Sequence, residues 1–297
     1  MKKIWKLILV LTLLSVLAAG CGKKGETAGD KAISGGTSDN SNTVSEETTG
    51  GEDSSKADTS LEDIKAKGKL ILGLDDAFPP MGFQNDKKEI VGFDIDVARE
   101  VCKRMGVELV LQPISWDAKE LELSTKNIDC IWNGLSYNEK RAEAMTLSDT
   151  YMKNRQVAVV LADSNVNTLA DLAGKIVVIQ NGSTASDAMD ANEDFKNSLK
   201  ELVKVEDNVQ ALLDLKTSGS DAVVMDEVVA RYYIDKEADT YRVLDEYLAE
   251  EDYVVGFRKG EEALCSEVEK YIKEMAADGT LAKICETWMG KDLTTIK

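Results

Sequence analysis

The sequence predicts an α/β protein made of two units, because its pattern of strand and helix signals occurs twice along the chain. Short apolar runs typical of buried strands alternate with helical patterns between residues 69 and 132, and the same alternation starts again after Gln156. A length of 297 residues with 43% apolar residues is enough for two cores. Strand, helix, strand order builds a parallel sheet with right-handed crossovers, so each repeat predicts one α/β unit.

The first unit opens with a buried strand at 69–74, and Pro79-Pro80 sets a rigid loop after the carboxyl end of that strand. Asp94 is expected to cap the next helix, whose apolar positions recur at helical spacing until Gly106 ends it. The remaining elements predicted for this unit are a strand at 107–111, a short helix at 115–123 and a strand at 127–132.

The second unit follows the same order, with helices that start after polar turns. Its predicted strands lie at 157–161, 175–180, 202–205 and 221–225, and its helices start at Leu169, at Asn181-Gly182-Ser183-Thr184 and at Asp207 or Asn208. One more strand is predicted at 253–257. Two amphipathic helices at 261–277 and 281–289 are expected to pack back on the first unit. The predicted domains are therefore 61–154 with 252–297 (domain 1) and 155–251 (domain 2).

The first residues indicate export. Lys2, Lys3 and Lys6 precede an apolar run at 7–17, and Leu17-Ala18-Ala19-Gly20-Cys21 follows. This resembles a bacterial lipoprotein signal peptide at 1–20, which implies cleavage before Cys21, a lipid on that cysteine and a protein anchored outside the cytoplasmic membrane. The alternative is a transmembrane anchor, but the run is shorter than the roughly 20 residues that a span needs.

Residues 21–60 predict a flexible linker, because after Cys21 they carry almost no large apolar side chains. A flexible chain of that length has a root-mean-square reach on the order of 35 Å. Such a linker suits a domain that stays near a membrane partner and still moves.

Composition excludes several classes of function. The net charge of −18 argues against nucleic acid as a partner, since phosphate binding needs a basic surface. The absence of histidine, CxxC and HExxH leaves no zinc site and no Ser-His-Asp arrangement, so we expect no metal, no cofactor and no catalytic residues. Cys102, Cys130, Cys265 and Cys285 permit disulfides in an exported chain, but their apolar surroundings favour buried thiols.

The stretch at 131–141 has the features of an anion site. Asn133, Gly134 and Ser136 lie where a strand gives way to a helix, whose first N–H groups and dipole attract negative charge. Arg141 adds a planar group that binds a carboxylate with two bonds. The alternative is a helix cap followed by a surface arginine.

Other polar side chains follow predicted strand ends in both units. Asp75 and Phe78 come after the first strand, Gly182, Ser183 and Thr184 after a strand of the second unit, and Asp226 after another. Ligands of α/β folds bind at the carboxyl ends of the strands. Donors with an arginine suit a carboxylate and Asp226 suits an ammonium, so together these residues match a zwitterion.

Four motifs in order resemble the solute-binding proteins of polar amino-acid ABC transporters, the family 3 extracellular solute-binding lipoproteins. The resemblance runs from Leu61 to Gly290. It implies a type II periplasmic-binding-protein-like fold, with two α/β sandwiches joined by a two-strand hinge. The motifs are Gly92-Phe93-Asp94-Ile95-Asp96-Val97-Ala98, Gly134-Leu135-Ser136 with Arg141, Asp221-Ala222-Val223-Val224-Met225-Asp226-Glu227, and Ala277-Asp278-Gly279-Thr280-Leu281-Ala282-Lys283-Ile284.

The resemblance also implies roles for site residues. Arg141 would pair with the ligand α-carboxylate, helped by the N–H groups of Ser136 and Thr184, next to Ser183. Asp226 would take the α-ammonium, with the Gly134 carbonyl and the Ser136 hydroxyl beside it. Phe78 and Trp116 would form aromatic walls, and Asp75 and Asn133 would be polar positions of the side-chain pocket. The alternatives are a capping role for Asp226 and core roles for the two aromatic residues.

The function implied is that of an extracytoplasmic, lipid-anchored monomer that binds a free amino acid and delivers it to an ABC permease. Trp132-Asn133 and Ala118-Lys119-Glu120 depart from the family pattern, and Asp75 with Glu120 favours a polar or basic amino acid or cystine. One alternative is an enzyme of the cyclohexadienyl dehydratase kind on the same scaffold, with Asp75, Glu120 or Glu227 as general acid. Another is an amino-acid sensor without a transporter.

Overall fold

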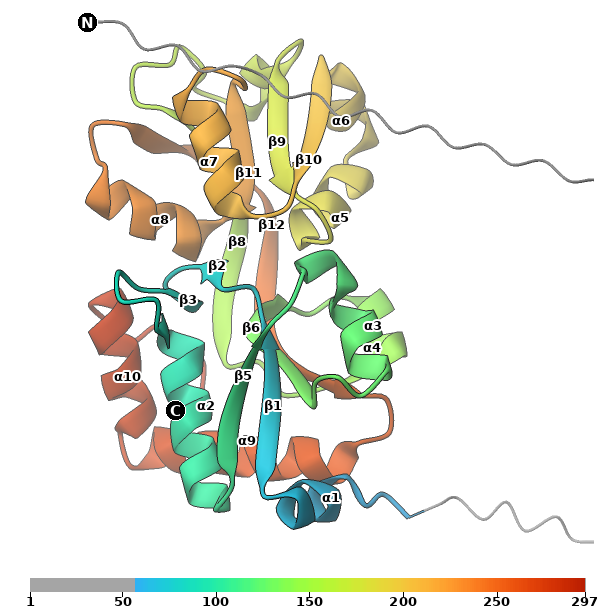
Figure 1. The fold of residues 1–297 in the computed structure, drawn as a ribbon. Helices are drawn as coiled ribbons and strands as arrows, with labels where there is room; N and C mark the ends of the chain where they lie inside the picture. The colour runs from blue at the N-terminus through green and yellow to red at the C-terminus, as the bar shows by residue number, and fades with distance from the viewer. Residues whose placement is uncertain (1–56, 297) are drawn as a thin grey trace, which may run out of the picture. The chain divides into compact units, whose positions relative to one another are not determined.

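Two long strands join the two halves of one mixed sheet in the computed structural model, which describes residues 57–296. The strand order is β10-β9-β11-β8-β12-β6-β1-β5, and β7 pairs with β12 beside this path (Figure 1). The predicted signal peptide, Cys21 and residues 22–56 of the predicted linker lie outside the described residues. Within residues 57–296, every helix is too short or too polar to cross a bilayer.

The first lobe is built on β1, whose alternate leucines are fully buried and which pairs in parallel with β5 and β6. A second, small antiparallel sheet of β2, β3 and β4 covers one end. The strands are β1 (Lys69–Leu74), β2 (Ala77–Phe78), β3 (Gly82–Gln84), β4 (Ile90–Val91), β5 (Glu108–Pro113), β6 (Cys130–Ser136) and β7 (Met145–Leu147). The helices are α1 (Ser60–Lys67), α2 (Phe93–Met105), the 3₁₀ turn η1 (Trp116–Ala118), α3 (Lys119–Ser124), α4 (Glu139–Ala144), α9 (Glu262–Ala277) and α10 (Thr280–Met289).

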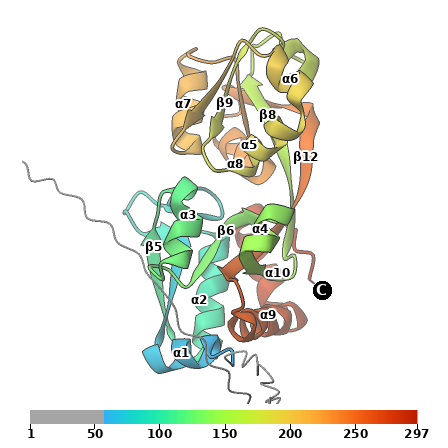
Figure 2. The same ribbon diagram turned by 90° about the vertical axis from the view of Figure 1, so that its right-hand side faces the viewer.

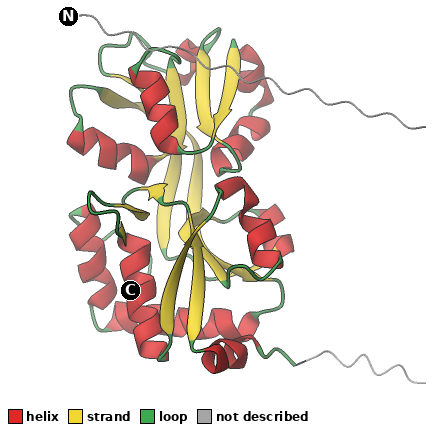
Figure 3. Cartoon of the chain, viewed as in Figure 1, coloured by secondary structure: helices red, strands yellow, loops and turns green. Residues whose placement is uncertain are grey.

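The second lobe repeats the arrangement, with β9 paired in parallel to β10 and β11 and with helices on both faces of the sheet (Figure 3). Its strands are β9 (Ile176–Gln180), β10 (Glu201–Val205) and β11 (Ala222–Asp226). Its helices are the 3₁₀ turn η2 (Leu169–Leu172), α5 (Thr184–Ala191), α6 (Glu193–Ser198), α7 (Asn208–Lys216) and α8 (Glu227–Lys236). The predicted fold class, two α/β sandwiches joined by two strands, is confirmed.

The joining strands are β8 (Met152–Leu161) and β12 (Tyr241–Arg258), which run antiparallel from one lobe to the other (Figure 2). Sequence patterns had predicted only 157–161 and 253–257, because the polar residues at the crossing hide the alternation of a half-buried strand. The proposed domain boundaries at 154/155 and 251/252 fall inside these strands, and the assignment of residues to the two domains stays a prediction.

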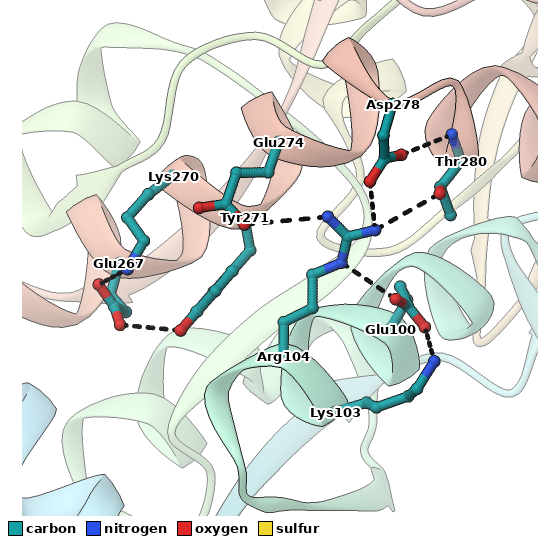
Figure 4. A network of polar contacts seen from close by, with 9 residues as sticks. All are labelled: Glu100, Lys103, Arg104, Glu267, Lys270, Tyr271, Glu274, Asp278 and Thr280. Atoms are coloured by element: carbon teal, nitrogen blue, oxygen red, sulfur yellow. Dashed lines mark hydrogen bonds and ion pairs between the residues drawn. The ribbon is translucent and has the colours of Figure 1, made fainter.

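The C-terminal helices pack on the first lobe as predicted, where α9 and α10 both contact α2. Arg104, near the end of α2, joins the three helices (Figure 4). Its guanidinium pairs with Asp278 at 2.8 Å and with Glu100 at 3.0 Å, and lies 3.9 Å from Glu274. These contacts attach the last part of the chain to the lobe that the first part builds.

Helix α1, which the sequence patterns did not predict, ties the start of the described chain to α9. Asp58 Oδ2 accepts the Ala263 N–H at 2.6 Å, and Ser60 Oγ accepts the Leu264 N–H at 3.1 Å. The first turn of a helix has unpaired N–H groups, and here side chains from far along the sequence satisfy two of them. Residues 58 and 60, placed in the predicted linker, thus contact the folded lobe.

The prediction that Asp94 caps α2 is wrong. The helix is preceded by Gly92 at φ +146°, where a Cβ would lie 2.2 Å from Met81 O, and Asp94 lies in the first turn. Its fully buried Oδ2 accepts the Gly134 N–H at 2.7 Å and the Tyr151 hydroxyl at 3.0 Å. Burial raises the pKa of Asp94 to about 7. Asp94 therefore holds the backbone at Gly134 in place.

The cysteines of the described chain are buried, as their apolar surroundings predicted. Cys102, Cys130 and Cys265 are thiols outside any disulfide and belong to the main core. Cys285 is buried in the same core, and its Sγ accepts the Leu293 N–H at 3.2 Å. They contribute as small apolar side chains.

Candidate functional site

The predicted site residues lie where the carboxyl ends of the strands of both lobes meet. Among the hydrogen bonds that cross the interface between the lobes there are those from Gln180 Nε2 to Asp75 Oδ2 (2.6 Å), from Thr184 Oγ1 to Ser136 Oγ (3.4 Å) and from Arg141 Nη2 to Gly182 O (3.4 Å). All predicted side chains are less than one-tenth exposed. The set is Asp75, Phe78, Trp116, Asn133, Ser136 and Arg141 from the first lobe and Ser183, Thr184 and Asp226 from the second, with Gly134 between Asn133 and Ser136.

Arg141 is a buried cation, 5% exposed, and not the surface arginine of the alternative interpretation. Asn138 Oδ1 accepts the Arg141 N–H at 2.7 Å and so starts α4, which turns the side chain inward. The guanidinium donates to Ser136 O at 2.6 Å and to Gly182 O. Burial lowers its pKa, and within residues 57–296 no carboxylate lies within ion-pair distance of it. A buried guanidinium with only carbonyl partners calls for an anion.

The N-terminus of α5 faces Arg141 from the second lobe. Gly182 makes the close approach possible, because its φ is +70° and a Cβ would lie 2.7 Å from Asp117 Cα. Ser183 precedes the helix and donates its hydroxyl to Gln180 O at 2.8 Å, so this side chain serves the local turn. The first N–H groups of a helix and its dipole add to the positive potential around the guanidinium.

Lys119 is a second buried cation of this region, and the sequence reasoning did not assign it. Its Nζ donates to Gly182 O at 2.9 Å and to Trp116 O at 3.1 Å, and lies 5.1 Å from the centre of the Trp116 ring. Burial lowers its pKa to about 8. The departure from the family pattern at Ala118-Lys119-Glu120 was the available signal for Lys119. The neighbouring Glu120 is half exposed, and its Oε1 lies 4.0 Å from Lys119 Nζ.

Asp226 lies at the carboxyl end of β11, and its carboxylate does not cap α8. Instead Oδ1 accepts Asn154 Nδ2 at 2.6 Å and the Tyr253 hydroxyl at 2.7 Å. Burial, and in second place the charge of Glu251, raises the pKa of Asp226 to about 7. The structure thus removes the alternative of a capping aspartate and leaves a buried carboxylate at the interface.

Glu251, Asn154 and Gln156 complete this end of the site and were missed by the sequence reasoning. Glu251 Oε2 accepts Ser136 Oγ at 2.7 Å, Asn154 Nδ2 at 2.9 Å and Gln156 Nε2 at 3.1 Å. All three residues lie on β8 and β12, in the part of those strands that the patterns did not reveal. The hydroxyl of Ser136, assigned to the ligand ammonium by resemblance, donates to Glu251 in this structure.

Asp75 marks the other end of the site. Its Oδ1 accepts the Ala77 N–H at 2.8 Å and its Oδ2 accepts Gln180 across the interface. Burial raises its pKa to about 6. Asn133 was expected beside Asp75, and its Oδ1 accepts the Asp75 N–H at 3.1 Å, which fixes the backbone at Asp75. Gln180 is a further interface residue that the sequence reasoning missed.

Trp132, which departs from the family pattern, packs in the hydrophobic core and not in the site. Trp132 is fully buried, and its ring lies 6.5 Å from that of Tyr151, centre to centre. Side chains alternate along a strand, so Trp132 points to the helix-covered face of β6. Of the two residues that depart from the family pattern here, Trp132 therefore packs in the core, and Asn133 is the one whose side chain contacts the site residue Asp75.

The raised pKa values predict that the ligand-free protein loses stability as pH rises. Asp226 and Asp94 titrate near pH 7 in the folded chain and near pH 4 when unfolded, so folding binds protons between these values. The contribution of these two groups to the free energy of unfolding is therefore fully present below pH 4. It is lost as the pH rises to about 7, by up to about 1.4 kcal/mol per pH unit for each group. Thermal unfolding at pH 5.5, 6.5, 7.5 and 8 measures this.

Asp226→Asn isolates the contribution of one group to this pH dependence. The variant keeps the size of the side chain and removes the buried charge, so its melting temperature relative to the unchanged protein should rise from pH 5.5 to about pH 7 and level off above that. A constant difference across this range would show that Asp226 does not titrate there.

Residues 57–296 have the two-lobed α/β architecture of type II periplasmic binding proteins, with the buried Arg141 and Asp226 where the lobes meet. The model of the bacterial extracellular solute-binding proteins, family 3, matches residues 70–291. The chain belongs to this family.

Individual relatives show the same kinship. The L-cystine-binding protein TcyJ of Escherichia coli (strain K12) is 30% identical over 236 residues, which cover 79% of this chain and 87% of TcyJ. The crystal structure of an ABC uptake transporter substrate binding protein from Streptococcus pneumoniae with bound histidine is 34% identical, with a TM-score of 0.78 over 80% of this chain and 99% of that one. The ancestral amino acid-binding protein AncCDT-1, a precursor of cyclohexadienyl dehydratase, is 30% identical, with a TM-score of 0.71 over 77% and 98%.

Proposed function

We propose that this protein binds a free amino acid where its two lobes meet and delivers it to an ABC permease. One observation carries the proposal: buried charges of opposite sign lie in one interface without ion-pair partners within residues 57–296, Arg141 at one end and Asp226 at the other. Leaving such charges unpaired is costly, and an amino acid zwitterion supplies both counter-charges at once. No reaction is needed to explain the arrangement.

In the proposed mode of binding, Arg141 and the first N–H groups of α5 hold the α-carboxylate, and Asp226 holds the α-ammonium. Charge-assisted bonds of this kind contribute roughly 1.5 to 3 kcal/mol each. Arg141 belongs to the first lobe and Asp226 to the second, so the ligand contacts both. It stabilises the closed arrangement of the lobes because only that arrangement offers all its contacts, and motion about β8 and β12 opens the site.

We infer that the ligand is a polar or basic amino acid or cystine. Asp75 supports this inference, since a buried carboxylate beside Gln180 favours a cationic or hydrogen-bonding side chain. Phe78 and Trp116 form the walls of the same pocket in this proposal. The names of the relatives, which bind cystine and histidine, agree with a ligand of this kind.

Asp75→Asn should reduce the preference for basic side chains. The change keeps the shape of the side chain and removes its charge, so L-arginine should lose roughly tenfold or more in affinity relative to L-glutamine. Calorimetric titration with both amino acids gives the ratio. Asp76→Asn, the same substitution at the adjacent and more exposed residue, is the matched control. Equal losses for both ligands would contradict a role of Asp75 in selecting the side chain.

The test of the function is a thermal-shift screen of the purified protein against the twenty amino acids and L-cystine. A ligand that binds only the folded state raises the melting temperature, because at a concentration of one hundred times its dissociation constant it adds about 2.7 kcal/mol to the free energy of unfolding. At least one amino acid should do so. A protein that none of them stabilises would overturn the proposal.

The lipid on Cys21 and the permease partner are parts of the proposal that rest on the signal-like first residues and on the family. Substituting Cys21 by serine should release the protein from the membrane fraction. Loss of amino-acid uptake on deletion of the gene distinguishes a transport receptor from a sensor that binds the same ligand without a transporter.

A second candidate function is a dehydratase acting on a cyclic carboxylate, which the similarity to AncCDT-1 brings into consideration. Two of its three candidate acids are poorly placed: Glu120 is half exposed, and Glu227 is paired with Arg231 on α8. Asp75 is buried with a raised pKa and could donate a proton. Formation of product from prephenate or arogenate would support this candidate over the binding protein.

A further inference from the structure

Glu251 is a buried carboxylate at the ammonium end of the site to which the family resemblance gives no role. It lies in the middle of β12, directly opposite Asn154 of β8, and is 9% exposed. Its Oε2 accepts hydrogen bonds from Ser136 on β6 of the first lobe and from Asn154 and Gln156 on the joining strand β8. The neighbouring Glu250 is exposed, so the strand turns Glu251 and not Glu250 toward the site.

One amide nitrogen connects Glu251 to Asp226. Asn154 Nδ2 donates to Asp226 Oδ1 at 2.6 Å and to Glu251 Oε2 at 2.9 Å. The two N–H bonds of an amide diverge, so the two carboxylate oxygens lie about 5 Å apart. An ammonium group has three diverging N–H donors and can donate to both oxygens at that separation.

The surroundings of this pair hold more acceptors than donors. Asn154 Oδ1 and Gln156 Oε1 are buried and have no hydrogen-bond partner within the described chain. The charged and titratable groups that face the pair are Tyr253 of β12, which donates to Asp226, Tyr151 behind it, and Arg141 of α4, which donates to Ser136 O and Gly182 O. Between residues 57 and 296, no lysine or arginine lies within ion-pair distance of either carboxylate. Two buried negative charges this close cannot both persist without a cation or a proton.

We propose that Glu251 is a second ammonium-binding carboxylate, which contacts the α-ammonium of the bound amino acid together with Asp226, and that the Asp226 carboxyl carries a proton in the ligand-free protein. This inference rests on the amino-acid binding proposed above. The ammonium arrives already protonated, so the O–H bond of Asp226 breaks and its proton passes to solvent when the ligand binds.

Proton release gives the proposal a signature that a structural role would not produce. Below the pKa of Asp226 the ligand must displace a proton, so affinity falls as pH drops from 8 to 6. Burial raises the pKa of Asp226 to about 7, which places the effect inside this range. Above pH 8 Asp226 has no proton to lose, and affinity becomes independent of pH.

The experiment uses calorimetric titration with the amino acid that gives the largest shift in the thermal-shift screen. Repeating the titration at pH 6 in buffers of different ionisation enthalpy counts the protons released. The unchanged protein should release about one proton, and Glu251→Gln should release clearly fewer, because loss of the neighbouring charge lowers the pKa of Asp226. At pH 8 the variant should bind roughly 10- to 100-fold more weakly, because one charged acceptor of the ammonium is lost.

Glu250→Gln is the matched control, since it removes the same charge from the adjacent, exposed position of β12. It should bind and release protons as the unchanged protein does. Asp226→Asn provides a second test should Glu251→Gln fail to fold: it should abolish proton release. A folded Glu251→Gln variant with unchanged affinity and unchanged proton release would overturn the role of Glu251 alone, whereas an unchanged protein that binds no amino acid would overturn the proposed function itself.

Discussion

Replacing Arg141 by alanine should weaken amino-acid binding by about 3 to 5 kcal/mol, since it leaves a buried ligand carboxylate without its charged partner. This is a loss of about two to four orders of magnitude in affinity. The fold should survive, because the guanidinium is bonded only to the Ser136 and Gly182 carbonyls and its buried charge is itself costly without a ligand. Calorimetric titration of the folded variant gives the difference.

Two further variants test the reason for this loss. Lys140→Ala removes a positive charge from the exposed face of the same helix and should leave affinity unchanged. Arg141→Lys keeps the charge and loses the planar pair of donors, so its affinity should lie between those of the unchanged protein and Arg141→Ala. Undiminished binding by a folded Arg141→Ala variant would refute the assignment of the carboxylate to this end of the site.

Replacing Gly134 by alanine should destabilise the protein by about 2 to 4 kcal/mol, since a left-handed conformation and an overpacked contact add their costs. The φ of Gly134 is +58°, and a Cβ there would lie 2.8 Å from Phe78 Cε1 and 3.2 Å from Tyr253 Cζ. Both rings face the site, and Tyr253 donates to Asp226, so ligand affinity should fall as well. Chemical denaturation measures the stability.

Gly260→Ala separates the two causes. Gly260 also has a positive φ, +87°, but nothing lies within 4 Å of the position of its Cβ. Its substitution should therefore show the conformational cost alone, about 1 to 2 kcal/mol. If Gly134→Ala costs no more than Gly260→Ala, the packing of Phe78 and Tyr253 against the glycine does not matter for stability.

The aspartates illustrate why only part of the site could be predicted. Asp226 ends an apolar run, and the carboxyl ends of parallel strands meet at one edge, so its position followed from the pattern. Asp94 lies at the start of a helix and was expected to be its N-cap. In the structure Gly92 occupies the N-cap position, and the carboxylate of Asp94 points into the core and accepts the Gly134 N–H. A local pattern fixes where a polar residue lies along the chain and leaves open which partner it finds.

Glu251 and Lys119 show the other limit. Glu251 lies in a stretch of β12 that the patterns did not reveal, and Lys119 lies in the short helix predicted at 115–123. Both owe their burial to contacts with residues far along the chain: Glu251 with Ser136, and Lys119 with Gly182. Trp132 shows the reverse, since an unusual residue next to the site faces the core. Proximity in sequence to a site did not decide which face of a strand a side chain occupies; the pairing of β6 with its neighbours did.

Local sequence patterns were sufficient to predict the alternation of strands and helices, the repeat of that alternation and the burial of the cysteines, because periodicity and turn chemistry are local properties. They also placed Asp75, Ser136 and Asp226 at strand ends, and Arg141 and Thr184 in the segments that follow strands. Tertiary contacts were needed to show that β8 and β12 run through both lobes and bring Asn154, Gln156 and Glu251 beside Asp226. Burial and hydrogen-bond partners depend on strand pairing between distant segments, which no window of the sequence contains.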